Sequence, residues 1–214
     1  MDIIQNTIKF VQQQLANAEG GHDWFHIERV YKNALLIAQS EPCNLQIVQL
    51  AALLHDIADS KFHDGDETVG PSTARSFLEQ QNIHPEVTNH VVSIIENISF
   101  KGGNFTKKFH SNELDIVQDA DRLDAIGAIG IARTFNYGGF KNRAIYNPAI
   151  APNLAMTKEE YKNNDAPTIN HFYEKLLLLK DKMNTPTAKQ IAQKRHEFMQ
   201  IYLTQFFNEW EGIQ

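Results

Sequence analysis

Four side chains of this sequence are of the types that bind divalent cations. They are His26, the adjacent pair His55 and Asp56, and Asp121. Two imidazole nitrogens and two carboxylate oxygens suit a divalent ion that keeps positions open for water and a substrate oxygen. If these side chains converge, the chemistry that they indicate is metal-dependent hydrolysis of a phosphate ester or anhydride.

Both histidines fall on apolar stripes that have helical spacing. Residues three, four, seven and eleven apart share one face of a helix. His26 shares such a face with Val30 and Ile37, and His55 follows Ala51 in the same way. One histidine in such a place is more often a buried structural residue than a ligand. Neither histidine therefore identifies a metal site by itself.

The third helical segment places carboxylates on an apolar stripe. Asp121 and Asp124 continue the row that Leu114 and Val117 begin. A buried carboxylate is costly unless it meets a cation or is protonated. Three such segments together favour one shared cation. The mixed donors favour Mn²⁺ as the first choice, and Fe, Mg²⁺, Co²⁺ and Ni²⁺ stay open. Asp124 is interpreted as the partner of a ligating histidine or of an arginine.

Helical periodicity recurs along the whole chain and strand patterns are nearly absent, so we expect one all-α domain over residues 1–214. A His-Asp pair also occurs at residues 22–23, but its position after two glycines makes Asp23 a helix N-cap. The apolar run Leu176–Leu179 is predicted to be buried, either against the body of the domain or against a second subunit. Irregular loops are expected over 60–70 and 136–168, and helices over 3–16, 24–40, 45–58, 71–80, 84–98, 113–135 (divided near Gly127 or Gly130), 168–183 and 187–210.

The composition limits the classes of partner. A net charge of −6 disfavours a broad nucleic-acid-binding surface. The single cysteine, Cys43, cannot form an internal disulfide, and no signal peptide or membrane span is apparent. We therefore expect a soluble cytoplasmic protein, without nucleic-acid or membrane partners. A homo-oligomer stays open.

The motifs around the four residues resemble those of a known superfamily. Segments 21–30, 54–61 and 118–127, together with 131–135, are similar to the motif series of the HD-domain metal-dependent phosphohydrolases, above all their small bacterial members. The resemblance covers most of the chain. It implies an HD-domain helical bundle with a metal-binding core over about residues 20–135, a loop at 136–168 and C-terminal helices at 169–212. It also implies hydrolysis of nucleoside triphosphates to monophosphates and pyrophosphate.

The resemblance assigns further roles. Asp59 lies at a position where the family often carries an acid that helps proton transfer, so we expect it to be catalytic; a solvated acid at a helix end is the alternative. Five basic residues are candidates for binding substrate phosphates, although each alone could be a surface or ion-pair residue. They are Lys61 and Arg29, followed by Lys101, Arg122 and Arg133.

Other functions remain open. Within enzymes, the alternatives are a phosphomonoesterase and a cyclic-nucleotide phosphodiesterase, because the superfamily includes such activities. Outside enzymes, the chain could sense a nucleotide without turnover, or it could be a helical interaction protein with fortuitous ligand-type residues. The expected partner in the leading interpretation is a phosphorylated small molecule, a nucleotide in the first place.

Overall fold

The expected all-α class is confirmed. The computed structural model describes residues 2–16, 23–57, 66–98, 109–157, 160 and 164–213, and every regular element in these ranges is helical. The chain forms two compact units, Met1–Asp121 and Arg122–Gln214. All four candidate metal-binding residues belong to the first unit. None of the described helices combines the length and the apolarity that a bilayer span needs.

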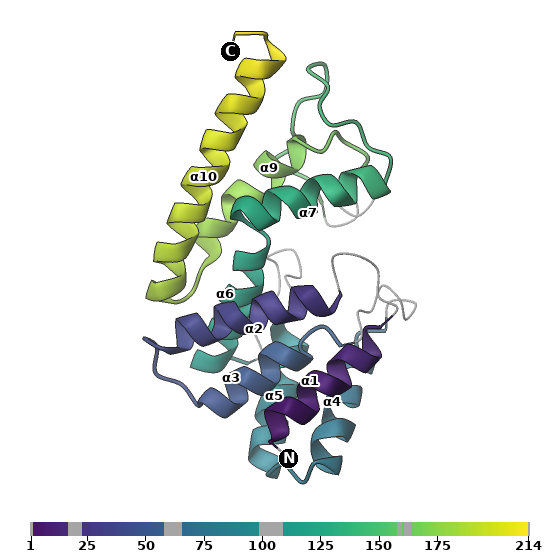
Figure 1. Cartoon of the computed structure of the whole chain (residues 1–214), viewed down its shortest axis with the longest axis vertical. Coiled ribbons are helices and arrows are strands. Elements are labelled where there is room, and N and C mark those ends of the chain that lie inside the picture. The colour runs from purple at the N-terminus through teal and green to yellow at the C-terminus, as the bar shows by residue number, and fades with distance from the viewer. Residues whose placement is uncertain are drawn as a thin grey trace. The chain divides into compact units, whose positions relative to one another are not determined.

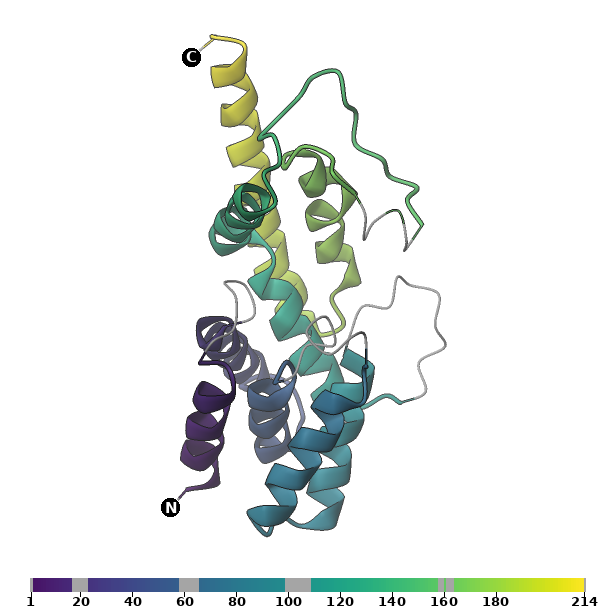
Figure 2. The same cartoon turned by 90° about the vertical axis from the view of Figure 1, so that its right-hand side faces the viewer.

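The first unit is built around one central helix, α3 (Leu45–Leu54). Leu50, Leu53 and Leu54 are fully buried, because α3 packs against three other helices, α1, α2 and α5. Helix α4 packs on α5, as the view in Figure 2 shows. A helix that is apolar on several sides needs such enclosure. The surrounding helices are α1 (Ile3–Gln14), α2 (Trp24–Ala38), α4 (Val69–Gln80), α5 (Pro85–Ile98) and α6 (Asn112–Asp124), shown in Figure 1.

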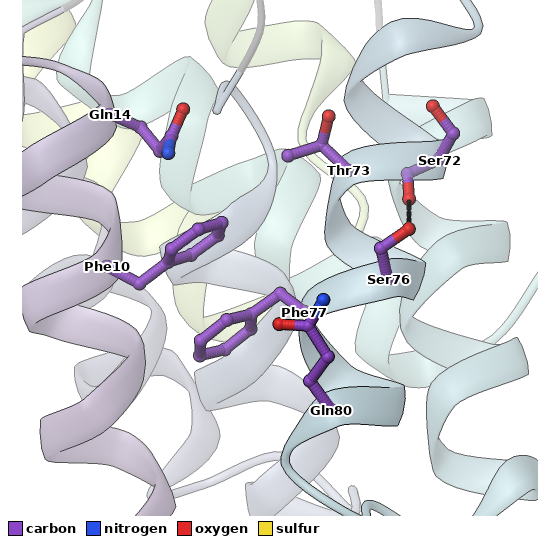
Figure 3. A pocket seen from close by; sticks show the side chains of 7 residues that line it. All are labelled: Phe10, Gln14, Ser72, Thr73, Ser76, Phe77 and Gln80. Atoms are coloured by element: carbon purple, nitrogen blue, oxygen red, sulfur yellow. Dashed lines mark hydrogen bonds between the residues drawn. The ribbon is translucent and has the colours of Figure 1, made fainter.

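Helices α1 and α4 meet through two aromatic rings. Phe10 and Phe77 stack with ring centroids 4.1 Å apart and planes at 5°. A shallow groove above the stack is lined by polar side chains of both helices, among them Gln14 and Ser76 (Figure 3). None of the candidate functional residues lines this groove, so the stack is best read as packing between two amphipathic helices.

Several predicted helix ends differ from the structure. Helix α3 ends at Leu54 and residues 55–57 form a turn, so the expected end at Ala58 is wrong. Helix α4 begins at Val69, which places Pro71 two residues inside it rather than at its first position. Proline is tolerated there because the first-turn amides have no partner within the helix. The expected 113–135 helix is divided after Asp124, close to the predicted break at Gly127.

The second unit contains α7 (Gly127–Phe140), α9 (Asn170–Glu174), the 3₁₀ helix η2 (Leu176–Lys182) and α10 (Pro186–Trp210). The long C-terminal helix α10 packs on α7 and η2, and α9 packs on η2. Because α7 continues to Phe140, the irregular segment begins at Lys141, later than the predicted 136. Aromatic side chains fill the space between these elements, including Phe135, Phe172 and Tyr202.

The predicted helix over 168–183 is wrong, and the leucine run explains the difference. The run adopts a 3₁₀ helix, in which residues three apart lie on one face. Leu176 and Leu179 are accordingly buried, at 3% and 5% exposure, whereas Leu178 is 49% exposed. Within the single chain the expected burial is therefore confirmed for Leu176 and Leu179 but not for Leu178. Burial of the run against a second subunit stays a prediction.

Candidate metal centre

The start of α2 positions His26. Asp23 is the N-cap, as predicted, and its side-chain oxygen accepts the backbone N–H of His26 at 3.0 Å. This hydrogen bond satisfies one of the free amides of the first turn. The His26 side chain lies on the buried face of the helix and is only 3% exposed. Capping by Asp23 therefore fixes the backbone from which the first imidazole projects.

The end of α3 positions His55. This residue is the C-cap of the helix, and its ring nitrogen Nδ1 lies 2.9 Å from the backbone carbonyl oxygen of Ala52. A carbonyl can only accept a hydrogen bond, so Nδ1 is the donor in this contact, and in a neutral ring Nε2 is the nitrogen that has the lone pair. Metal-binding histidines are commonly oriented by such a contact. The side chain is 4% exposed, so neither its tautomer nor its direction is set by water.

The four candidate residues are brought together by the fold. One possible ligand atom from each of His26, His55 and Asp56 lies within 4.8 Å of the others. The carboxylate oxygen Oδ1 of Asp121 lies 3.5 Å from Nε2 of His26 and 3.9 Å from Nε2 of His55. Atoms bound to one ion about 2 Å away lie roughly 3–4 Å from each other. The donor atoms thus stand close to the separations that one divalent ion imposes.

Asp121 is held in place by contacts along α6. Asn33 of α2 donates to the carbonyl of Ala120 at 3.3 Å, and Gln118 donates to the carbonyl of Ile98 on α5 at 3.0 Å. These bonds attach α6 to two neighbouring helices within one turn of Asp121. The Asp121 side chain is 40% exposed, in contrast to the buried histidines. The cluster therefore has a dry side, formed by imidazoles, and a side open to solvent.

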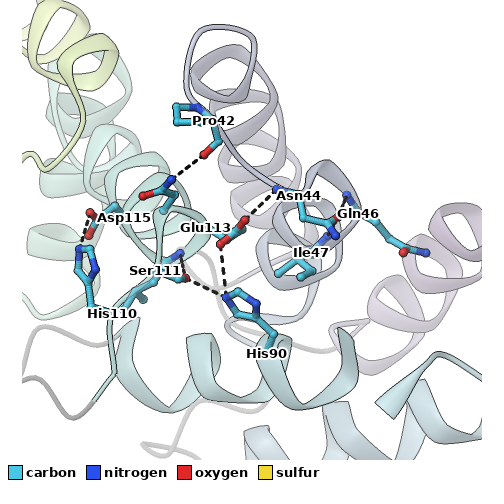
Figure 4. Close-up of polar contacts among 11 residues, drawn as sticks. Pro42, Asn44, Gln46, Ile47, His90, His110, Ser111, Glu113 and Asp115 are labelled. Carbon is cyan, nitrogen blue, oxygen red and sulfur yellow. Dashed lines mark hydrogen bonds and ion pairs between the residues drawn. The ribbon is translucent and has the colours of Figure 1, made fainter. Parts of the chain in front are cut away.

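The beginnings of α3 and α6 are joined by a polar cluster (Figure 4). Glu113 of α6 accepts the backbone N–H of Asn44, the N-cap of α3, at 2.7 Å. His90 of α5 lies 2.9 Å from the Ser111 hydroxyl and 3.4 Å from the other oxygen of Glu113. His90 thus contacts residues at the start of α6, and these contacts give it a structural role. The cluster also fixes two helices that carry candidate metal ligands at their far ends.

The donor set fits a divalent ion. Two neutral imidazole nitrogens and two carboxylates bring a charge of about −2, which one divalent cation neutralises. The side chain of Asp121 adds an accessible oxygen, and the histidines add directed lone pairs.

The structure describes only some of the other predicted site residues. Asp59, Lys61 and Lys101 lie outside the described residues. Helix α3 ends at Leu54, before His55 and Asp56. Arg29 lies on α2, one turn after His26, and is half-buried.

Two predicted arginines lie in the second unit. Arg122 donates to the carbonyl of Lys182, and Arg133 pairs with Asp124 at 2.5 Å. The interpretation of Asp124 as an arginine partner agrees with this pair. The sequence did not indicate the Ala52 carbonyl as a partner of His55, because a backbone acceptor leaves no mark on residue type.

Known proteins resemble this chain over most of its length. The sequence profile of the HD domain matches residues 24–126. The uncharacterized protein YpgQ of Bacillus subtilis (strain 168) is 38% identical over 207 residues, which cover 95% of this chain and 92% of that protein. A solved HD-superfamily hydrolase from Bacillus thuringiensis is 44% identical, with a TM-score of 0.78 and coverage of 98% of this chain and 97% of that chain.

A second solved structure shows a relative with a bound nucleotide. It is Bacillus subtilis YpgQ in complex with ADP, which is 36% identical, has a TM-score of 0.77 and covers 99% of this chain and 100% of that chain. These likenesses extend far beyond the residues that the domain profile matches. Because relatives of this identity span nearly its whole length, the chain belongs to the HD-domain superfamily of hydrolases.

Proposed function

We propose that the chain is a metal-dependent phosphohydrolase that converts nucleoside triphosphates to monophosphates and pyrophosphate. The observation that carries the proposal is the position of His55: its Nδ1 lies 2.9 Å from the carbonyl oxygen of Ala52, and its Nε2 lies 3.9 Å from the carboxylate oxygen Oδ1 of Asp121. A buried histidine that is oriented towards a second histidine and two carboxylates is prepared for a cation.

His26, His55, Asp56 and Asp121 would hold the divalent ion, with Mn²⁺ as the first candidate. A bound divalent ion lowers the pKa of water and offsets negative charge that develops on a phosphoryl group. The buried histidines exclude water from one side of the cluster. The exposed side of Asp121 is where a phosphate oxygen would approach. The protein therefore fixes the orientation of the metal ligands and leaves one side of the site open to a substrate phosphate.

A nucleotide is the proposed substrate because the relative YpgQ binds ADP in its solved structure. In the proposed reaction a water oxygen forms a bond to the α-phosphorus, the bond between the α-phosphorus and its bridging oxygen breaks, and pyrophosphate leaves. We assign proton transfer to Asp59, as acceptor from the water or donor to the leaving group. Lys61, Arg29 and Lys101 are proposed to contact the phosphates, with Arg122 and Arg133 as further candidates.

Product analysis tests the proposal. Full-length protein is incubated with Mn²⁺ and nucleoside triphosphates, cyclic nucleotides or monophosphates, and products are separated by chromatography. Pyrophosphate and a monophosphate are expected from triphosphates. Release of inorganic phosphate alone would instead indicate a phosphomonoesterase, a monophosphate from cyclic nucleotides would indicate a phosphodiesterase, and binding without product would indicate a sensor.

A pair of histidine variants distinguishes loss of the metal site from a general effect of replacing a histidine. His55→Gln should lower turnover more than about 100-fold, because it removes a directed nitrogen donor. His84→Gln is the matched control, since the His84 side chain is 70% exposed and lies in a different loop. Turnover by His55→Gln at the wild-type rate would contradict the assignment of the metal centre. Bound metal, measured by elemental analysis after dialysis, should fall in parallel with turnover.

A further inference from the structure

Asn33 interrupts an apolar stripe of α2. Its neighbours on the stripe, Val30 and Ile37, are fully buried, and His26 lies on the same stripe two turns before it. Asn33 itself is half-buried, and a polar side chain in such a place loses hydration unless it makes a hydrogen bond. Its amide Nδ2 donates to the backbone carbonyl of Ala120 on α6 at 3.3 Å. This stripe of α2 thus carries both a candidate metal ligand and a hydrogen bond to α6.

The acceptor carbonyl does not depend on this bond for a partner. Within an α-helix the carbonyl of Ala120 also accepts the backbone N–H four residues later, which belongs to Asp124, the last residue of α6. A carbonyl oxygen has two lone pairs, so the two bonds coexist. The amide of Asn33 therefore adds little to the integrity of α6 itself. What the bond fixes is the position of α6 relative to α2.

The relative position of these two helices determines one separation within the candidate metal centre. Nε2 of His26, on α2, lies 3.5 Å from Oδ1 of Asp121, on α6. The acceptor residue, Ala120, directly precedes Asp121 in the chain. Because α2 is one continuous helix, the bond from Asn33 to Ala120 also limits how far Asp121 can move relative to α2.

Asp121 depends on such support more than the histidines do. The side chains of His26 and His55 are 3% and 4% exposed, so packing holds them, whereas that of Asp121 is 40% exposed. A half-exposed carboxylate has fewer neighbours to fix its rotamer, so its placement depends more on the backbone that carries it. Metal sites accept ligand distances only within about 0.2 Å of the preferred values. A small displacement of α6 would therefore disturb the metal centre through Asp121.

We propose that Asn33 is a positioning residue of the metal centre and acts through Asp121. Its amide holds the backbone before Asp121 at the distance from α2 that a shared divalent ion requires. The inference rests on the metal centre proposed above and adds a residue that does not itself bind the ion. Removing a group that orients a metal ligand commonly weakens metal binding by about 10–100-fold. We expect the lower end of this range, because Asn33 contacts the backbone beside a ligand rather than the ligand's side chain.

Mn²⁺ binding to nucleotide-free, full-length protein tests the role of Asn33. Free Mn²⁺ is measured by electron paramagnetic resonance during a titration. Asn33→Leu keeps a similar side-chain volume but cannot donate, so it should raise the Kd for Mn²⁺ about tenfold. Asn6→Leu is the matched control, because Asn6 of α1 is also half-buried and its amide donates to Gln81, the C-cap of α4, at 2.8 Å. The Kd of this control should equal that of the wild type.

A double-mutant cycle distinguishes positioning of Asp121 from a general weakening of the fold. If Asn33 acts through Asp121, Asn33→Leu should change the Kd by less than about twofold once Asp121→Ala has removed the carboxylate. An equal rise in Kd in both backgrounds would show an effect that does not pass through Asp121. An unchanged Kd for Asn33→Leu in the otherwise wild-type chain would show no effect on the metal centre. Either result overturns the proposal.

The remaining outcomes separate this inference from the proposed function. Asn33→Ala is a second, smaller variant that introduces no clash and should also raise the Kd. If both variants lose helical circular dichroism in the absence of metal, Asn33 is a folding residue and the proposal is overturned. A wild type that binds Mn²⁺ but hydrolyses no triphosphate contradicts the proposed function, whereas the Kd values still decide the role of Asn33. A wild type that binds no Mn²⁺ overturns both.

Discussion

Replacing His171 by glutamine should remove a large part of the acid sensitivity of the second unit. Burial keeps the imidazole neutral in the folded state, where its pKa is lowered from 6.5 to about 3. Unfolding exposes the ring and lets it take up a proton below about pH 6.5. The folded state therefore has its full stability above that pH and loses it as the pH falls towards 3.

The size of the effect follows from the two pKa values. At pH 5 the unfolded ring is almost fully protonated and the folded ring is almost fully neutral. Linkage then lowers the free energy of unfolding by about 2 kcal/mol relative to pH 8. Glutamine does not titrate, so His171→Gln should show a pH dependence that is smaller by about this amount. The variant's absolute stability can differ from that of the wild type without affecting this comparison.

Urea unfolding at pH 8 and pH 5 measures the effect. A Trp24→Phe background leaves Trp210 as the only tryptophan, and its ring lies 4.9 Å from that of Tyr146 in the second unit. Its fluorescence therefore reports on the unit that contains His171. His84→Gln serves as the exposed-histidine control. If His171→Gln and wild type lose the same free energy between the two pH values, the burial argument for His171 is refuted.

Two further substitutions test how the elements are fixed. Gly127→Ala should lower the free energy of unfolding by about 1–3 kcal/mol, because Gly127 has φ +77° and a Cβ there would lie 3.0 Å from Cγ of Arg195. Gly139→Ala, where a Cβ would meet nothing within 4 Å, should cause no loss; equal thermal midpoints for the two variants would contradict this reading. Asn44→Ala should cost about 1 kcal/mol in urea unfolding because Asn44 caps α3. Asn44→Asp should retain stability, and an equal loss in both variants would show that the cap is not the cause.

The sequence predicted the elements best where local chemistry decides the outcome. Asp23 is predicted as an N-cap because it follows two glycines at the start of a helical stretch, and its hydrogen bond with the backbone N–H of His26 is present. The centre of α3 was identified by its apolar residues, such as Leu50 and Leu54, which are fully buried. The gathering of the four metal-type residues was inferred because carboxylates on an apolar stripe need compensation. The structure brings these residues together.

The failures arose where tertiary contacts decide the outcome. The end of α3 could not be placed because residues 55–58 are compatible with a continued helix, and what stops it is not visible in local spacing. The leucine run was expected to continue a helix, but burial of only Leu176 and Leu179 favours the 3₁₀ geometry.

The early stop of α3 has a chemical consequence. In an uninterrupted helix the carbonyl of Ala52 would be taken by the amide four positions later, which belongs to Asp56. Because the helix stops at Leu54, that oxygen is released to the imidazole of His55 instead. Helix length and the protonation pattern of this ring are thus coupled. If α3 continued for one more turn, the Ala52 carbonyl would accept a backbone N–H and would no longer orient the His55 ring. The ring could then rotate or change tautomer, and Nε2 would no longer be directed towards the site, although every ligand residue remained in the sequence.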